Sequence, residues 1–224
     1  MDGTQRTYVS CSLILGRTTV RMCEVVRYAL RYNLQVLVDS YDTSDILQNA
    51  LTLDRSSLAF LDTADPVRGM LKTVKLTQPA RFDDACVQPA CVPNKEIQAG
   101  DIDFDDCRFV GYGDTSSALG GAPPQRLMEV EATVERASIS KNTLVVRRKI
   151  GSEKTGPCFN DFGSPVICSL LDTKEWVTVG MTSGVALPCE SGLTMNVTVE
   201  NLMREAVNPD FYNSLQSFRY SIRR

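Results

Sequence analysis

The 224-residue sequence contains no histidine. Histidine is the usual general base near neutral pH, and nucleophile systems that pair serine or cysteine with an imidazole depend on it. Its absence also excludes zinc sites of the HExxH and Cys₂His₂ types. The chain therefore lacks the side chain that hydrolases most often use to move a proton, and we expect neither a metal nor a cofactor.

Other features are also missing. No apolar run approaches the length of about 18 residues that a transmembrane helix needs. The formal net charge is −3, so no basic surface indicates nucleic acid or an anionic membrane as a partner. The first ten residues lack a signal-peptide pattern. Either that segment has been removed or replaced, or the chain begins inside a longer product.

Cysteines are present in an even number, but no two form a CxxC pair, which argues against a zinc ribbon or a thioredoxin-type redox motif. Paired disulfides in an oxidising compartment, and hence a secreted protein, are the favoured interpretation. The alternative is a cytosolic protein with buried free thiols. The eight cysteines are Cys11, Cys23, Cys86, Cys91, Cys107, Cys158, Cys168 and Cys189.

Short apolar and β-branched runs between turn residues predict an all-β fold. The expected strands are residues 8–15, 34–38, 57–61, 73–76, 107–110, 126–134, 144–148, 164–170, 176–182 and 193–197. Short helices are expected at 25–32 and 200–207. The acidic segment 100–106 and the turn-rich segment 113–125 are expected to be surface loops. Calcium binding by residues 101–106 is the less favoured alternative to a solvated loop.

Residues 156–168, GPCFNDFGSPVIC, hold two cysteines around an Asp-X-Gly-X-Pro core. The run resembles the nucleophile loop of trypsin/chymotrypsin-like serine proteases, C-x-G-D-S-G-G-P-L-V-C. Asp161, Gly163, Pro165 and Cys168 match this pattern. Phe162 stands at the position of the nucleophilic serine, and a phenyl ring cannot attack a carbonyl group.

Five further stretches resemble the same family in order and spacing. They are KLTQPARFDDACVQPACVPN (75–94), CRFVGYGDT (107–115), RLMEVEATV (126–134), WVTVGMTSGVALPC (176–189) and SGLTMNVTVENLMREAV (191–207). The resemblance implies two packed six-stranded Greek-key barrels and a short C-terminal helix. Before residue 75 it is thin: residues 8–23 resemble a shortened family segment, and no I-V-G-G terminus is present. The N-terminal barrel is therefore expected to be truncated or rearranged.

The resemblance also implies a domain layout. Residues 1–207 would form the protease-like domain, with the N-terminal barrel at about 1–74, the inter-barrel segment at about 75–105 and the C-terminal barrel at about 106–199. The C-terminal helix would span about 200–207. Residues 208–224 would form a tail.

The family's catalytic positions are all replaced. The base histidine corresponds to Met22 and the nucleophile to Phe162. The orienting aspartate corresponds to Met70, or in a rival alignment to Ser57. Neither Met70 nor Ser57 carries the buried negative charge that holds an imidazole. The resemblance therefore implies a protein that is not an enzyme.

The implied substrate pocket is altered as well. Its positions are Gly156, Asn160, Asp161, Ser183, Gly184 and Val185. Val185 replaces a glycine along which substrate normally approaches, and Asn160 replaces an oxyanion-hole glycine. Asp161 keeps a carboxylate that in the family pairs with a new N-terminal ammonium group. Without that terminus, Asp161 requires another partner if it is buried.

The resemblance implies three disulfides, Cys11–Cys23, Cys107–Cys168 and Cys158–Cys189, which leave Cys86 and Cys91 as a local pair. The Asn196-Val197-Thr198 tripeptide is an acceptor sequence for N-glycosylation.

As a function, the resemblance implies a non-catalytic, secreted regulator, cofactor or decoy in an extracellular proteolytic cascade. Its partner would be a protease, a zymogen or an inhibitor. Two alternatives stay open: a structural or accessory secreted protein without a cascade partner, and a decayed paralogue that does not fold.

Overall fold

The computed structural model describes residues 35–37, 50–60, 72–76, 91, 93, 96–113, 126–141, 143–149, 158, 161, 163–184 and 196–205. These residues form an almost entirely β structure in which every strand pair is antiparallel, which confirms the all-β prediction for this part of the chain. The elements are β1 (Gln35–Leu37), β2 (Ala50–Phe60), β3 (Lys72–Leu76), the 3₁₀ helix η3 (Ala99–Asp101), β4 (Ile102–Gly111), β5 (Met128–Val134), the 3₁₀ helix η4 (Arg136–Ser138), β6 (Thr143–Arg148), β7 (Pro165–Leu170), β8 (Trp176–Gly184), β9 (Asn196–Asn201) and the helix α2 (Leu202–Glu205).

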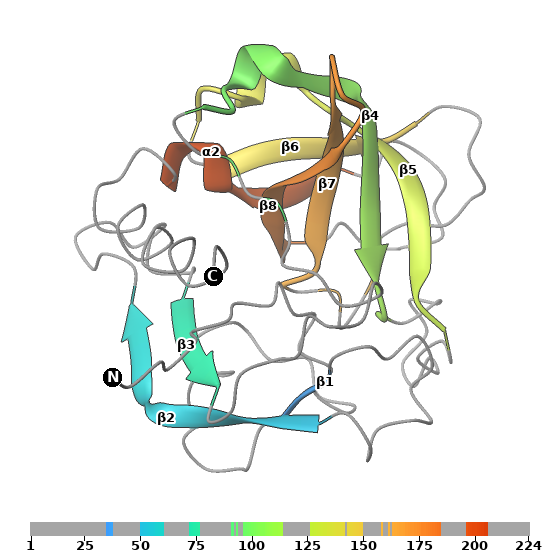
Figure 1. The fold of residues 1–224 in the computed structure, drawn as a ribbon. Helices are drawn as coiled ribbons and strands as arrows, with labels where there is room; N and C mark the ends of the chain where they lie inside the picture. The colour runs from blue at the N-terminus through green and yellow to red at the C-terminus, as the bar shows by residue number, and fades with distance from the viewer. Residues whose placement is uncertain are drawn as a thin grey trace.

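Six strands close into a barrel in the order β4-β5-β6-β9-β8-β7, with β7 pairing back onto β4 (Figure 1). Strands β4, β5 and β6 are consecutive neighbours, whereas β7 returns to lie on the other side of β4. This spatial order, with the fourth strand beside the first, is a Greek-key connection. Closure leaves none of the six strands with an unpaired edge.

The barrel core follows the two-residue period of its strands. In β6, the buried Leu144 and Val146 alternate with half-buried or exposed neighbours, and in β8 Val177 and Val179 belong to the same core. The other buried members of this core are Ile102, Phe104, Cys107, Phe109, Ala132, Val134, Val166 and Cys168. Valine, isoleucine and phenylalanine suit this position because their branched or flat side chains pack well on a pleated surface.

The predicted surface loop at residues 100–106 is wrong. Its last five residues are the start of β4, and Ile102 and Phe104 are buried in the core. Between Asp103 and Cys107 the register with β7 shifts, so the buried positions change from Ile102 and Phe104 to Cys107 and Phe109. This β-bulge lets an acidic run continue as a strand, because the aspartates are kept out of the core.

Strands β1, β2 and β3 form a separate three-stranded sheet, which Figure 1 shows below the barrel. Strands were expected at 34–38, 57–61 and 73–76, and each overlaps one of these strands. Strand β2 begins earlier than expected, at Ala50, and its register with β3 is irregular between Asp54 and Ala59. The strand expected at 8–15 and the helix expected at 25–32 lie outside the described residues.

The C-terminal helix begins later than predicted. Glu200 and Asn201 belong to β9, and α2 covers Leu202–Glu205. Asn201 is buried, and its Oδ1 accepts a hydrogen bond from the Met203 amide at 3.1 Å, as a residue at the start of a helix can do. The strands of the closed barrel run from Ile102 to Asn201. No helix among the described residues is long and apolar enough to cross a membrane.

Candidate functional site

The positions expected from the protease resemblance are described only in part. Met22, Met70 and Phe162, the three replaced catalytic positions, lie outside the described residues. So do Gly156, Asn160 and Val185 of the implied pocket. Ser57, the alternative aspartate position, lies in β2, of which only the backbone is described. The remaining positions, Asp161, Ser183 and Gly184, can be examined in the structure.

Asp161 is buried, with 5% of its surface exposed. Its Oδ1 accepts a hydrogen bond from the Gly113 amide at 2.8 Å, and its Oδ2 accepts one from the Cys158 amide at 2.8 Å. The Ser164 hydroxyl, 3.5 Å from Oδ1, is a further donor to this carboxylate. Amide donors of this kind compensate the loss of hydration that burial of a carboxylate entails. A buried Asp161 was expected to need such partners.

Two glycines make room for this carboxylate. A Cβ atom on Gly111 would collide with Asp161 Oδ1 and lie 2.9 Å from Ser164 Oγ, and one on Gly113 would collide with both carboxylate oxygens of Asp161. Gly111 is the last residue of β4, and Gly113 follows two residues later. The Gly-Tyr-Gly run of residues 111–113 thus allows the backbone to approach Asp161 closely.

The turn that carries Asp161 is joined to β8. Gly163 adopts a φ of 85°, which favours glycine, and its amide donates a 2.8 Å hydrogen bond to the Thr182 carbonyl. The Ser164 carbonyl accepts hydrogen bonds from the Thr182 amide at 2.9 Å and from the Thr182 hydroxyl at 3.0 Å. These three bonds fix the entry into β7.

Ser183 and Gly184 lie at the end of β8, next to this turn. Thr182 pairs with Val199 and Gly184 with Thr198, so Ser183 is the extra residue of a bulge in the β8–β9 pair. The side chain of Ser183 is half-buried. The structure thus brings Asp161, Thr182 and Ser183 to the same end of the barrel, as the ladder and the turn bonds require.

One of the implied disulfides is present in the described part. Cys107 of β4 is bonded to Cys168 of β7, with Cα atoms 4.0 Å apart. Cys158 is disulfide-bonded too, and its expected partner Cys189 lies outside the described residues. The pairings Cys11–Cys23 and Cys86–Cys91 stay predictions, since Cys11, Cys23 and Cys86 also lie there.

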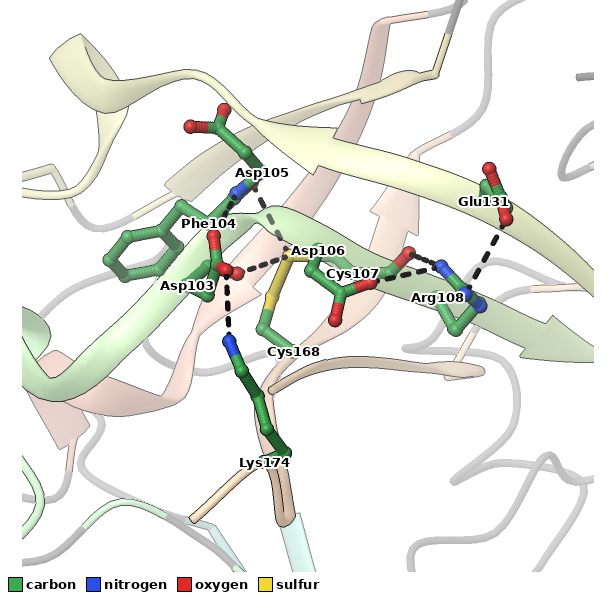
Figure 2. A network of polar contacts seen from close by, with 9 residues as sticks. All are labelled: Asp103, Phe104, Asp105, Asp106, Cys107, Arg108, Glu131, Cys168 and Lys174. Atoms are coloured by element: carbon green, nitrogen blue, oxygen red, sulfur yellow. Dashed lines mark hydrogen bonds and ion pairs between the residues drawn. A yellow bond between two sulfur atoms is a disulfide. The ribbon is translucent and has the colours of Figure 1, made fainter. Parts of the chain in front are cut away.

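The acidic start of β4 is matched by cations, of which Figure 2 shows Lys174 and Arg108. Lys174, in the β7–β8 turn, lies 3.7 Å from Asp103. Arg136 of η4 forms a 3.0 Å ion pair with Asp105. Arg108 contacts Asp106 at 3.3 Å.

Asp103, Asp105 and Asp106 thus each face a cation, whereas the Asp101 carboxylate accepts a hydrogen bond from the Gln98 amide at 2.8 Å. Within the described ranges, no three His, Cys, Asp or Glu side chains are arranged to hold a metal ion.

Arg108 also contacts the single tryptophan of the chain. Its guanidinium carbon lies 5.4 Å from the centroid of the Trp176 ring, and NH2 lies 3.5 Å from Glu131. Trp176 is 40% exposed at the start of β8. Sequence reasoning did not identify this contact, because no local pattern relates β4, β5 and β8 to one another.

The described residues of the site surround one buried carboxylate with hydrogen-bond donors. Ser164 is the serine nearest to the carboxylate, yet it is fully buried and therefore closed to a substrate. The sequence did not predict that Ser164 contacts Asp161. It showed only that Ser164 lies in the nucleophile-loop motif, between Cys158 and Cys168. The described contacts of the arrangement hold backbone segments together.

A comparison with models of protein families and a search of curated proteins each found no match to the chain.

Proposed function

We propose that the chain is a non-catalytic homologue of trypsin/chymotrypsin-like serine proteases and acts by binding a protein partner outside the cell. In this proposal the described barrel is the C-terminal one of two Greek-key barrels, and β1–β3 belong to a shortened N-terminal one. The partner is a protease, a zymogen or an inhibitor of a proteolytic cascade, and the chain serves as its regulator, cofactor or decoy.

The burial and hydrogen bonding of Asp161 carry the proposal. The aspartate of the nucleophile-loop pattern is buried, and it accepts amide hydrogen bonds from Cys158 of its own motif and from Gly113 of the Gly-Tyr-Gly motif. The resemblance concerned these two motifs independently, so their contact in space supports it. The Cys107–Cys168 disulfide, another implied pairing, joins the same two parts of the chain.

The absence of histidine supports the non-catalytic part of the proposal. A serine nucleophile of this family needs an imidazole to accept its proton, and Phe162 stands where the serine is expected. What such a framework retains is shape: exposed loops on a closed, disulfide-bonded barrel can recognise a partner by surface complementarity.

Activity-based labelling tests the non-catalytic claim. We expect the purified chain to give no covalent adduct with a fluorophosphonate probe and no hydrolysis of peptide esters, while trypsin in the same buffer gives both. A fluorophosphonate adduct on any serine, mapped by mass spectrometry, would refute the claim.

Capture from the native extracellular fluid tests the binding claim. The immobilised chain is expected to retain a protease, a zymogen or a protease inhibitor as its main partner, and a reduced and alkylated sample serves as the control. Retention of only matrix or storage proteins would instead favour a structural or accessory role.

A further inference from the structure

Asp161 joins two backbone segments between which the described residues form no strand pairing. In the β4–β7 ladder the last pair at this end is Phe109 with Val166. Both Gly113, after the end of β4, and Asp161, before the start of β7, lie past this end of the ladder. There the Asp161 carboxylate accepts hydrogen bonds from the amides of Gly113 and Cys158, where the ladder has no further pair.

Each carboxylate oxygen has its own amide donor. Oδ1 accepts from Gly113 and Oδ2 from Cys158, both at 2.8 Å. An asparagine at position 161 would keep the shape but offer only one accepting oxygen, so its NH₂ group would face an amide N–H of Gly113 or Cys158. Both bonds therefore need a carboxylate at position 161.

The rest of the barrel is secured by other contacts. The Cys107–Cys168 disulfide joins β4 to β7 below the Phe109–Val166 pair. Val146 in β6 is buried and is paired on both sides, with Val134 of β5 and Val197 of β9. Release of the Asp161 carboxylate would break none of these interactions.

From these contacts we infer that Asp161 is a latch: its two amide bonds open and close as one unit, independently of the barrel. In the closed state the end of β4 is held against Cys158. In the open state Gly113 and Cys158 lose their acceptors while the strand pairing persists. This is a local opening of the kind seen in native-state hydrogen exchange. The inference does not depend on the proposed function.

Amide hydrogen exchange followed by NMR on the unmodified protein tests the latch. At low denaturant, the Gly113 and Cys158 amides are expected to exchange with the same small denaturant dependence, and at least about 10-fold faster than the Val146 amide relative to their intrinsic rates. Exchange of Gly113 and Cys158 with different denaturant dependences would overturn the inference. So would exchange of both together with Val146 in global unfolding.

The variant Asp161→Asn provides a second test, with Asp106→Asn as the control because Asp106 is a partly exposed surface carboxylate. In Asp161→Asn, exchange at Gly113 and Cys158 is expected to rise by about 10-fold or more, with Val146 changed by less than about 2-fold. In Asp106→Asn all three amides are expected to keep their rates. Unchanged exchange in Asp161→Asn, or an equal rise at Val146, would contradict the latch. If Asp161→Asn does not fold, the measurement on the unmodified protein decides.

Discussion

The Gly113 amide donates a 2.8 Å hydrogen bond to Asp161 Oδ1, although 48 positions separate the two residues in the chain. The contact exists because Gly111 and Gly113 leave room for the carboxylate and because β4 and β7 are neighbours in the barrel. It links two of the motifs that carry the protease resemblance.

Gly111→Ala is expected to lower the free energy of unfolding by about 2–4 kcal/mol, because the new methyl group would overlap Asp161 and crowd Ser164. Urea denaturation followed by tryptophan fluorescence measures the loss. Gly100→Ala is the matched control, since no atom lies within 4 Å of a Cβ there. Equal stability of Gly111→Ala and Gly100→Ala would show that the close approach at Gly111 is wrong.

Ser169→Ala is expected to leave stability unchanged or to raise it by up to about 1 kcal/mol, because the Ser169 hydroxyl is buried and has no hydrogen-bond partner. Ser138→Ala is the comparison. The Ser138 hydroxyl donates to the Glu135 carbonyl at 2.6 Å and accepts from the Val145 amide at 2.9 Å.

Loss of the Ser138 hydroxyl should cost about 1–3 kcal/mol, since it leaves the Val145 amide without an acceptor. Thermal unfolding of both variants gives the comparison. A larger loss of stability in Ser169→Ala than in Ser138→Ala would contradict these hydrogen-bond assignments.

Asn201→Asp is expected to destabilise the barrel by about 2–4 kcal/mol. The Asn201 Nδ2 donates to the carbonyls of Ile139 at 2.9 Å and Lys141 at 2.8 Å, and it thereby ties β9 to the β5–β6 connection. Aspartate keeps the acceptor for Met203 but turns a second oxygen toward those two carbonyls, where no donor remains.

The urea midpoint measures this loss. Lys141→Ala serves as the control because it alters only an exposed side chain and retains the carbonyl that Asn201 contacts. A midpoint of Asn201→Asp equal to that of the control would mean that the two carbonyl contacts contribute nothing.

Arg108→Met is expected to make Trp176 easier to quench with acrylamide and to cost about 1 kcal/mol, since the guanidinium stacks beside the indole ring and pairs with Glu131. Trp176 is the single tryptophan, so its fluorescence reports this site without other signals. Arg136→Met, which removes an exposed ion pair with Asp105, should leave quenching unchanged. If both variants quench alike, the stacking is not present in solution.

The strands whose residues alternate between apolar and polar, or are apolar throughout, could be predicted from the sequence. Strand β6 was expected within one residue of its observed start at Thr143, and β7 and β8 were expected within two residues at each end. The start of β4 was missed because aspartate is rare in strands. Only the tertiary partners Lys174 and Arg136, far along the chain, show why Asp103 and Asp105 are tolerated there.

The candidate site could also be predicted only in part. The nucleophile-loop pattern singled out Asp161, and general physics required partners for a buried carboxylate. The identity of one partner, Gly113, depends on how β4 meets β7, which no local pattern encodes. The Arg108–Trp176 contact was missed for the same reason, as it joins β4 to β8 across β7.

The distance between the side chains of Met22 and Phe162 tests the central claim most directly. If the chain has the framework of the trypsin-like proteases with its catalytic groups replaced, these two side chains stand where a base and a nucleophile would meet. A crystal structure of the purified protein should then show them in van der Waals contact, at about 4 Å. Side chains separated by more than about 10 Å, with another residue layer between them, would contradict the account.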